Sequence, residues 1–270
     1  MPTDQALPMF TIITSTYNAA GLLPSTARSL EAQTCQEFEW IIIDGASTDE
    51  TVSVARGFGN LVTLLISEKD SGIYSAWNKA LPHIRGDWVI FLGAGDSLFD
   101  SEVLSSVRVE LDKIDEQVTT VYGNVLRFYD TPGRSDRLRT DVWMGVKGPW
   151  VGGRPVLPCH QGVFQRALLF HAGFKFDSRC KISADNEILL REFIKGHGRK
   201  IDLMISRFHA GGISAQRDRR LRMVAESIFI NLKLGLFWKR PFYQLYMLAG
   251  NSLKHAFYLV LSKLTWHRVD

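Results

Sequence analysis

Three runs in this chain of 270 residues place carboxylates beside small or polar residues, a composition suited to binding a phosphorylated ligand. Asp44 opens the run 44–49 directly after an apolar stretch, where a carboxylate can accept hydrogen bonds from a ribose hydroxyl or a base N–H. Asp96 closes the run 91–96, whose small residues would let a metal ion and a pyrophosphate approach the backbone. Asp185 stands near a predicted helix start and could act as a general base toward a hydroxyl nucleophile. These carboxylates suggest nucleotide binding, metal binding and proton transfer.

Each run also has a purely structural explanation. Asp49 is better explained as the cap of a following helix, and Asp96 between small residues could simply form an Asx turn. Either Asp185 or Ser183 could be an N-cap, an explanation about as strong as the catalytic one. For Asp44 we favour a functional role, because a carboxylate that ends an Ile-Ile-Ile run has no local structural task.

A fourth polar run covers residues 67–79. Asp70 and Gly72 precede a predicted helix that carries Asn78 and Lys79. Polar residues at this spacing can share one side of the segment, which suits the holding of a diphosphate or a sugar. For Lys79 the simpler explanation, a solvated lysine on an amphipathic helix, is favoured.

The elements that would position these residues alternate between strand and helix along the first 100 residues. Strands are predicted at 10–15, 40–44, 61–66 and 88–92, and helices at 21–33, 49–57 and 72–84. This alternation is typical of a doubly wound α/β layer, in which ligands bind beyond the carboxyl ends of the strands. Several polar residues fall on that rim: Tyr17, Asn18, Asp44, Ser47 and Asp49.

Beyond residue 100 an irregular segment interrupts the pattern. Helices are predicted at 101–117, 166–171 and 188–195, and strands at 118–129 and 199–208. We expect the segment 130–158, which contains Trp150, to be functional or mobile, as long loops inside compact domains usually are. Tryptophan rings can stack on sugars, but they also serve as packing anchors. His160 could bind a metal or a phosphate, although a satisfied core histidine is the favoured explanation.

Composition restricts the setting. The net charge of +4 and the sequence pI near 9.0 suit an anionic substrate or membrane surface without requiring either. Three widely spaced cysteines with no CxxC pair argue against a disulfide framework or a structural zinc site, so we expect a cytoplasmic protein. The N-terminus does not resemble a signal peptide.

The C-terminal residues 216–270 differ from the rest in being basic and rich in aromatic residues. No window of 18 uncharged apolar residues occurs there, so a transmembrane span is not predicted. We predict a basic amphipathic helical tail whose residues 217–266 lie on a membrane surface. The alternative is a solvated or oligomer-forming tail.

Taken together, the motifs resemble the family 2 glycosyltransferases, which have a GT-A fold. The resemblance runs in order through residues 11–18, 29–34, 43–51, 67–79, 86–96, 160–161, 173–177, 184–187 and 211–214. It covers roughly residues 8–215 and is strongest to the single-domain bacterial subgroup that builds surface polysaccharides. It implies a GT-A domain at 1–215, with a nucleotide-binding half at 8–100 and an acceptor-side half at 101–215, in which a mostly parallel sheet is flanked by helices.

The resemblance implies an inverting transfer of a sugar from a nucleotide-diphosphate donor, which we expect to be a UDP-sugar, to a lipid-linked saccharide. Carried over by position, the donor-binding residues are Thr14, Tyr17, Asn18, Asp44, Ser47, Asp70, Gly72, Asn78, Ala94 and Gly95. The acceptor side would comprise Trp150, His160, Gln161 and Glu187. Asp185 would be the catalytic base, with Glu187 as the fallback, and Asp96 would bind Mn²⁺ or Mg²⁺.

The sequence departs from the common family pattern in two places. Gly93 and Gly95 stand where many members carry acidic residues, so Asp96 alone would supply the motif's carboxylate. Ala184 stands where many members have Glu, which leaves Asp185 as the clear base.

Two other classes of protein compete with this interpretation. One is a catalytically silent protein of the same fold that binds only a nucleotide or a partner. The other, a nucleotidyltransferase, is disfavoured because no basic residue follows the first strand within 14–21. We expect no nucleic-acid partner. An oligomer is compatible with the sequence, and the expected location is the inner face of the cytoplasmic membrane.

Overall fold

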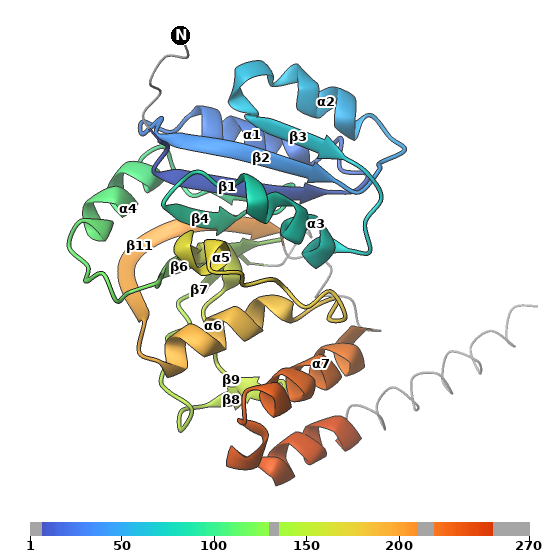
Figure 1. The fold of residues 1–270 in the computed structure, drawn as a ribbon, viewed down its shortest axis with the longest axis vertical. Coiled ribbons are helices and arrows are strands. Elements are labelled where there is room, and N and C mark those ends of the chain that lie inside the picture. The colour runs from blue at the N-terminus through green and yellow to red at the C-terminus, as the bar shows by residue number, and fades with distance from the viewer. Residues whose placement is uncertain (1–6, 130–134, 210–218, 251–270) are drawn as a thin grey trace, which may run out of the picture.

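The computed structural model describes residues 7–129, 135–209 and 219–250 (Figure 1). The strands are β1 (Phe10–Thr16), β2 (Phe38–Asp44), β3 (Leu64–Ser67), β4 (Trp88–Phe91), β5 (Ser97–Leu98), β6 (Thr120–Phe128), β7 (Arg137–Arg139), β8 (Trp150–Val151), β9 (Arg154–Pro155), β10 (Val163–Arg166) and β11 (Gly198–His209). The α-helices are α1 (Leu23–Glu31), α2 (Thr51–Gly57), α3 (Ile73–Ala80), α4 (Val103–Leu111), α5 (Leu168–His171), α6 (Ala184–Ile194) and α7 (Arg220–Lys233). Residues 241–250 are also helical, and η3 (His160–Gly162) and η6 (Phe237–Lys239) are short 3₁₀ turns.

One large sheet runs through the molecule in the order β3-β2-β1-β4-β10-β6-β11-β5, with β7 added beside β6. The four strands of the N-terminal half are parallel, whereas β10 pairs antiparallel with both of its neighbours. The chain moves outward from β1 to β3 and then returns to place β4 on the other side of β1. The carboxyl ends of β1 and β4 therefore flank the point where the strand order reverses, which is where open α/β sheets bind ligands.

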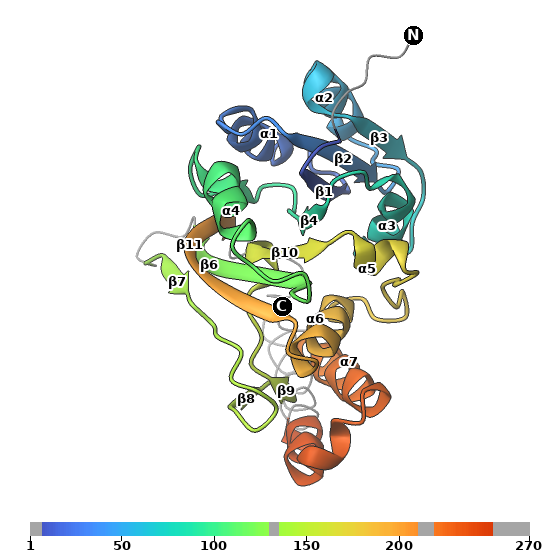
Figure 2. The same cartoon turned by 60° about the vertical axis from the view of Figure 1, so that its left-hand side comes forward.

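Helices cover both faces of this sheet (Figures 1 and 2). Alternate residues of a strand point to opposite faces, so Ile12 packs with Leu23 of α1 while Ile13 packs with Trp77 of α3. Helix α4 lies on the first face and α6 on the second. The predicted α/β architecture is confirmed, with its parallel part confined to the N-terminal half and the β6–β11 pair.

Most predicted elements agree with the structure to within a few residues, but the helix predicted at 101–117 is shorter, ending with α4 at Leu111, and strand β10 was not predicted. Two further differences are informative. Helix α6 begins at Ala184, earlier than the predicted helix at 188–195, so that Asp185 lies in its first turn. The segment 130–158 is less irregular than predicted, since it contains β7 and the β8–β9 hairpin.

Part of the predicted tail and of the sequence resemblance lies outside the described residues. The motif 211–214 and residues 216–218 and 251–270 are not described, while 219–250 are largely helical, as predicted. Within the described ranges, no helix is both long and apolar enough to cross a bilayer.

Candidate active site

The loops after β1 and β2 hold each other in place at the rim of the sheet. Asn18 has a positive φ of 48°, its backbone N–H donates to the Ser47 hydroxyl over 2.8 Å, and its side-chain oxygen accepts the Thr48 N–H over 2.9 Å. The neighbouring Tyr17 side chain is 66% exposed. The predicted rim residues Tyr17, Asn18 and Ser47 thus lie together, and an exposed aromatic ring beside them could stack on a base.

Asp44 lies beneath these loops and is fully buried. Its carboxylate accepts the Thr16 hydroxyl at 2.9 Å, the Ser67 hydroxyl at 2.7 Å, and both the N–H and the hydroxyl of Ser47. Burial acts to raise the pKa of Asp44, but the hydrogen bonds from Ser47, Ser67 and Thr16 together outweigh it and leave the pKa below its usual value. The premise that this carboxylate has no local structural task is wrong, because Asp44 ties together the ends of β1, β2 and β3.

Thr14 faces the core rather than the rim, so its placement among the donor-binding residues needs correction. Its side chain has no exposed surface, and its hydroxyl accepts the indole N–H of the buried Trp40 over 2.9 Å. Strand alternation gives Thr14 and Thr16 the same face, but only Thr16 stands far enough along β1 to reach Asp44.

Asp70 and Gly72 form a turn that meets the loop after β2. The Asp70 carboxylate accepts the Gly72 N–H over 2.8 Å, and a Cβ at Gly45 would lie 2.8 Å from its other oxygen. Gly72 has a φ of 124° immediately before α3, a conformation that other residues rarely adopt. The turn therefore lies against the Asp44 loop, as expected for a shared donor site.

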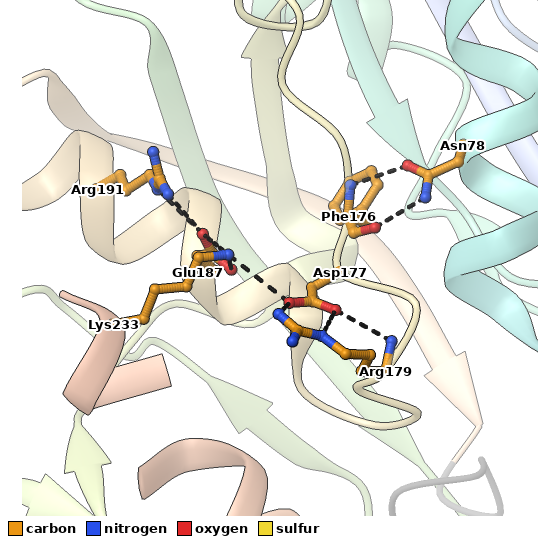
Figure 3. Close-up of polar contacts among 7 residues, drawn as sticks. All are labelled: Asn78, Phe176, Asp177, Arg179, Glu187, Arg191 and Lys233. Atoms are coloured by element: carbon orange, nitrogen blue, oxygen red, sulfur yellow. Dashed lines mark hydrogen bonds and ion pairs between the residues drawn. The ribbon is translucent and has the colours of Figure 1, made fainter. Parts of the chain in front are cut away.

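Asn78 has a structural role instead of the predicted donor-binding one. Its amide group donates to the Phe176 carbonyl over 2.8 Å and accepts the Phe176 N–H over 2.9 Å (Figure 3). The amide nitrogen and the amide oxygen of Asn78 are both engaged by Phe176, so Asn78 fixes the segment before Asp177 onto α3.

The turn that carries Asp96 is built against helix α1. Gly95, with a φ of 92°, donates its N–H to the Thr26 hydroxyl over 3.0 Å, and this hydroxyl donates to the Asp96 carbonyl over 2.7 Å. One Asp96 carboxylate oxygen accepts the Gly93 N–H over 3.2 Å, and Ala94 is half-buried between them. A Cβ at Gly93 would lie 2.8 Å from the same oxygen, so small residues are required here.

These residues fit a divalent cation that is shared with a phosphate ligand. Asp96 offers a carboxylate oxygen, the type of ligand that Mg²⁺ prefers, and such ions often take one or two carboxylates with substrate phosphates. No group of three His, Cys, Asp or Glu side chains that could hold a metal occurs within the described ranges. A diphosphate and water would therefore complete the coordination.

Asp185 lies half-buried in the first turn of α6. One of its carboxylate oxygens accepts the Tyr74 hydroxyl over 2.7 Å, and in the part of the chain that the structure describes the other has no side-chain donor. Burial, followed by the negative charge of Asp185, raises the pKa of Tyr74 well above its usual value, so Tyr74 remains a donor. The sequence reasoning missed Tyr74, whose only signal was its position two residues after Gly72 in the 67–79 run.

The charge of Asp185 acts on His160 and Arg154, and Gln161 follows His160 in η3. The His160 ring stacks on Trp77 at 4.8 Å, and its Nε2 atom is buried with no hydrogen-bond partner among the described residues. Burial lowers the pKa of His160 although the charge of Asp185 opposes this, and burial likewise lowers the pKa of Arg154 against the same charge. Arg154 was predicted only as part of the loop 130–158, and nothing in the sequence of that loop indicates that the charge of Asp185 acts on it.

Cys159 connects the Asp96 turn with this cluster. Its thiol donates to the Gln161 side-chain oxygen over 3.1 Å. Burial is the main cause that raises the Cys159 pKa to about 12, and the charge of Asp96 adds to it. The charges of Asp96 and Asp185 thus act on adjacent residues of one segment, Cys159 and His160.

Two predicted acceptor-side residues are structural. Trp150 is 7% exposed, donates its indole N–H to the Val146 carbonyl over 2.8 Å, and packs against Tyr243, so the anchor explanation holds. Glu187 is 2% exposed and forms ion pairs with Arg191 and Lys233, which join α6 to α7 (Figure 3). Glu187 therefore cannot serve as the fallback base.

Comparison with known proteins gives consistent matches. A family model described as "Glycosyl transferase family 2" matches residues 11–159. The "PGL/p-HBAD biosynthesis glycosyltransferase" of Mycobacterium tuberculosis is 36% identical over 193 residues, which cover 70% of this chain and 71% of that protein. An "uncharacterized glycosyltransferase" of the same species is 26% identical over 252 residues, which cover 93% of this chain and 90% of that protein.

Solved structures agree in fold at low sequence identity. Staphylococcus aureus TarS 1–349 in complex with UDP has a TM-score of 0.59 and 19% identity over 82% of this chain, which spans 65% of the TarS chain, less than two thirds. Mannosyltransferase PcManGT from Pyrobaculum calidifontis, in complex with GDP-Man and Mn²⁺, has a TM-score of 0.60 and 18% identity over 98% of this chain and 82% of its own.

Proposed function

Because the chain belongs to glycosyl transferase family 2 and has its GT-A fold, we propose that it transfers a sugar from a nucleotide-diphosphate donor to an acceptor hydroxyl with inversion. The observation that carries this proposal is the Asp185 carboxylate. Tyr74 binds one of its oxygens and leaves the other available in the first turn of α6, and the charges of Asp185 and Asp96 act on the adjacent residues His160 and Cys159. A positioned carboxylate with a free oxygen can accept the proton of an attacking hydroxyl.

The donor would bind across the loops after β1, β2, β3 and β4. Tyr17 would stack on the base, and the Ser47 and Asp70 loops would approach the ribose and diphosphate. The hydroxyls that now saturate Asp44 would exchange for donor groups. A UDP-sugar is favoured because TarS was solved with UDP and with UDP-GlcNAc, whereas PcManGT was solved with GDP-Man.

The reaction would be a single displacement. The acceptor oxygen forms a bond to the anomeric carbon as its proton passes to Asp185, and the bond from that carbon to the diphosphate oxygen breaks with its electron pair leaving on the diphosphate. Tyr74 would hold Asp185 in place, while His160, neutral because burial lowers its pKa, would bind the acceptor through Nε2. A divalent cation, Mn²⁺ or Mg²⁺, would neutralise charge on the leaving diphosphate, and Asp96 would hold it.

We place the reaction in the assembly of a surface polysaccharide such as capsule, O-antigen or exopolysaccharide. The acceptor would be a lipid-linked saccharide at the inner face of the cytoplasmic membrane. Support for this assignment comes from the resemblance of the chain to the single-domain subgroup and from its basic C-terminal helices.

The test is release of nucleoside diphosphate from UDP-, GDP- and dTDP-sugars, with membrane lipids as acceptors and with Mn²⁺, Mg²⁺ or EDTA. We expect metal-dependent release from one donor, reduced about 10²- to 10⁴-fold in Asp185→Asn while UDP still binds. Asp202→Asn is the matched control, because this exposed aspartate accepts a 3.3 Å hydrogen bond from Asn124 on β6, in a part of the sheet without proposed site residues. Tight nucleotide binding without turnover by the wild type would instead support a catalytically silent binding protein.

A further inference from the structure

The C-terminal helical segment exposes a set of large apolar side chains, here called the outer face, formed by Trp238, Phe242, Leu245 and Tyr246. Their exposed fractions are 74%, 86%, 52% and 72%. Positions three and four apart lie on one side of a helix, so Phe242, Leu245 and Tyr246 of the 241–250 helix form a single stripe. Trp238 precedes them in η6, before the chain leaves helical geometry at Arg240, and is also exposed. Isolated exposed apolar residues are ordinary, but a contiguous stripe indicates an interaction surface.

The contacts of the opposite side show that this stripe truly faces outward. Gln244 is fully buried and accepts the Asn231 amide over 2.9 Å, and the Tyr243 hydroxyl donates to the Trp150 carbonyl over 3.1 Å. The helix is therefore fixed against α7 and the β8–β9 hairpin by its inner side. Figures 1 and 2 both place it at one extremity of the described chain, beyond α7.

The surroundings of the outer face are basic. Residues 219–250 contain six basic residues and one acidic residue, Glu226. Lys233 pairs with Glu187 and Arg222 with Glu226, whereas Arg219, Arg220, Lys239 and Arg240 form no ion pair within the described ranges. Glu226 is 8% exposed, and its carboxylate accepts the backbone N–H groups of residues 181–183, so it adds little negative charge at the surface. A basic surface around exposed aromatic residues attracts anionic phospholipid headgroups.

We propose that the outer face inserts into the interface of an anionic lipid bilayer. Tryptophan and tyrosine prefer the membrane–water boundary, where an apolar ring and a polar atom are both accommodated, and neighbouring basic side chains can reach the headgroups. A second copy of the chain is the less suitable occupant. A symmetric contact through this face would bring the same basic residues of two copies together.

This surface is linked to the site, and the inference deepens the proposed function by naming where a lipid-linked acceptor would be met. Tyr243 and Arg240 bind carbonyl groups of residues 147–150, and Asn231 donates to the Gly153 carbonyl over 2.7 Å. The residue after Gly153 is Arg154, on whose pKa the negative charge of Asp185 acts. Docking through the outer face would therefore hold the hairpin that carries Arg154 close to the bilayer.

The experiment is sedimentation of the full chain with vesicles of phosphatidylcholine, alone or mixed with phosphatidylglycerol. We expect the wild type to bind the anionic vesicles. Binding should fall about tenfold or more in Trp238→Gln/Phe242→Gln/Tyr246→Gln, because three apolar side chains that insert into the bilayer interface are replaced by polar ones. The matched control is Val109→Gln/Leu168→Gln/Ile194→Gln, which changes three exposed apolar residues on other helices and should bind like the wild type. Circular dichroism checks that both triple variants remain folded.

Three results would overturn the inference: no vesicle binding by the wild type, equal loss in both triple variants, or a concentration-dependent dimer that only the outer-face variant loses. The last result would assign the face to self-association. Nucleotide affinity and donor hydrolysis are measured in the same samples without lipid. Failure of the proposed function would appear there, whereas failure of the membrane inference would leave those values intact.

Discussion

The two edges of the parallel half-sheet carry similar buried carboxylates at opposite ends of β2. At the amino edge, Glu39 is 2% exposed and accepts the Thr11 hydroxyl, the guanidinium and backbone N–H of Arg85, and the Gly86 N–H. At the carboxyl edge, fully buried Asp44 accepts three hydroxyls and one N–H. Saturation of a buried carboxylate by donors therefore does not in itself mark a functional site.

The difference between the edges lies in the partners. Glu39 is held by backbone N–H groups and a guanidinium, which keep a fixed direction once the fold is formed. Asp44 is held mainly by hydroxyls, those of Thr16 and Ser67 at strand ends and that of Ser47 in a loop, and a hydroxyl can rotate and exchange for a hydroxyl or N–H group of a ligand. Hydroxyl donors, which can rotate, are thus more numerous around Asp44 than around Glu39, a difference that we expect where a ligand binds.

Neutralising each carboxylate in turn tests whether Asp44 and Glu39 differ in their effect on UDP binding. Asp44→Asn should weaken UDP binding about 10- to 100-fold, because a hydrogen bond to a charged group is worth ~1.5–3 kcal/mol. Isothermal titration calorimetry measures this. Glu39→Gln should lower the free energy of unfolding by ~1–3 kcal/mol while UDP affinity stays within about twofold of the wild type. Equal losses of affinity in the two variants would show that the edges do not differ in function.

A third buried carboxylate extends the comparison to the acceptor half. Glu226 of α7 accepts the N–H groups of Lys181, Ile182 and Ser183 at 2.8, 2.9 and 3.0 Å, just before the helix turn that carries Asp185. Glu226→Gln should reduce kcat about tenfold with a smaller change in donor KM, because a displaced base affects the chemical step more than donor binding.

Glu192→Gln provides the matched control for that effect. Glu192 is 3% exposed and binds Thr119, Lys195 and His197 at the far end of α6. Its neutralisation should cost similar stability in thermal unfolding but leave kcat nearly unchanged. A parallel fall of kcat in both variants would mean that general destabilisation of α6, and not the position of Asp185, controls the rate.

The same contrast explains what the sequence could and could not predict. The donor half is made of consecutive strand–helix units, so the strands near 10–15 and 40–44 and the clustering of Asn18 with Ser47 followed from local patterns. Thr14 was predicted to lie at the rim but is buried against Trp40, because the sequence does not show at which residue a strand passes from the core to the rim.

The acceptor half depends on contacts between distant segments. Glu187 pairs with Lys233, 46 residues later, and Tyr74 meets Asp185 across 111 residues. Trp150 is anchored by Tyr243, and Asn78 by the backbone of Phe176. No periodicity in the sequence reports such pairings, so motif position alone did not show that Glu187, Trp150 and Asn78 are held by these contacts.

A smaller effect should appear in the pH dependence of stability. The Arg179 guanidinium lowers the pKa of Asp177 from 3.8 to about 2 in the segment before α6 (Figure 3). A depressed carboxyl pKa stabilises the fold above the unfolded value, and this contribution is lost as pH falls from 3.8 toward about 2. Asp177→Asn should therefore be less stable at pH 7 by ~1 kcal/mol, a modest value because solvent screens the exposed Arg179.

Urea unfolding at several pH values tests this prediction. The wild type should lose its advantage over Asp177→Asn within that acidic window, and the two should converge below it. A constant difference at all pH values would mean that Asp177 acts through packing rather than through its charge.

The smallest effect on UDP affinity is expected at Thr14. Thr14→Val leaves the buried indole N–H of Trp40 without its acceptor and should lower the free energy of unfolding by ~1 kcal/mol, while UDP affinity remains unchanged. Thr16→Val, two residues along the same face of β1, removes a donor to Asp44 and should weaken UDP binding measurably, because one of the hydroxyls that adjust around that carboxylate is gone. Calorimetry and urea unfolding of the two variants compare core and rim at neighbouring positions of one strand. If Thr14→Val weakened UDP binding as much as Thr16→Val, the boundary between core and ligand site would lie deeper in β1 than the hydrogen bond to Trp40 indicates.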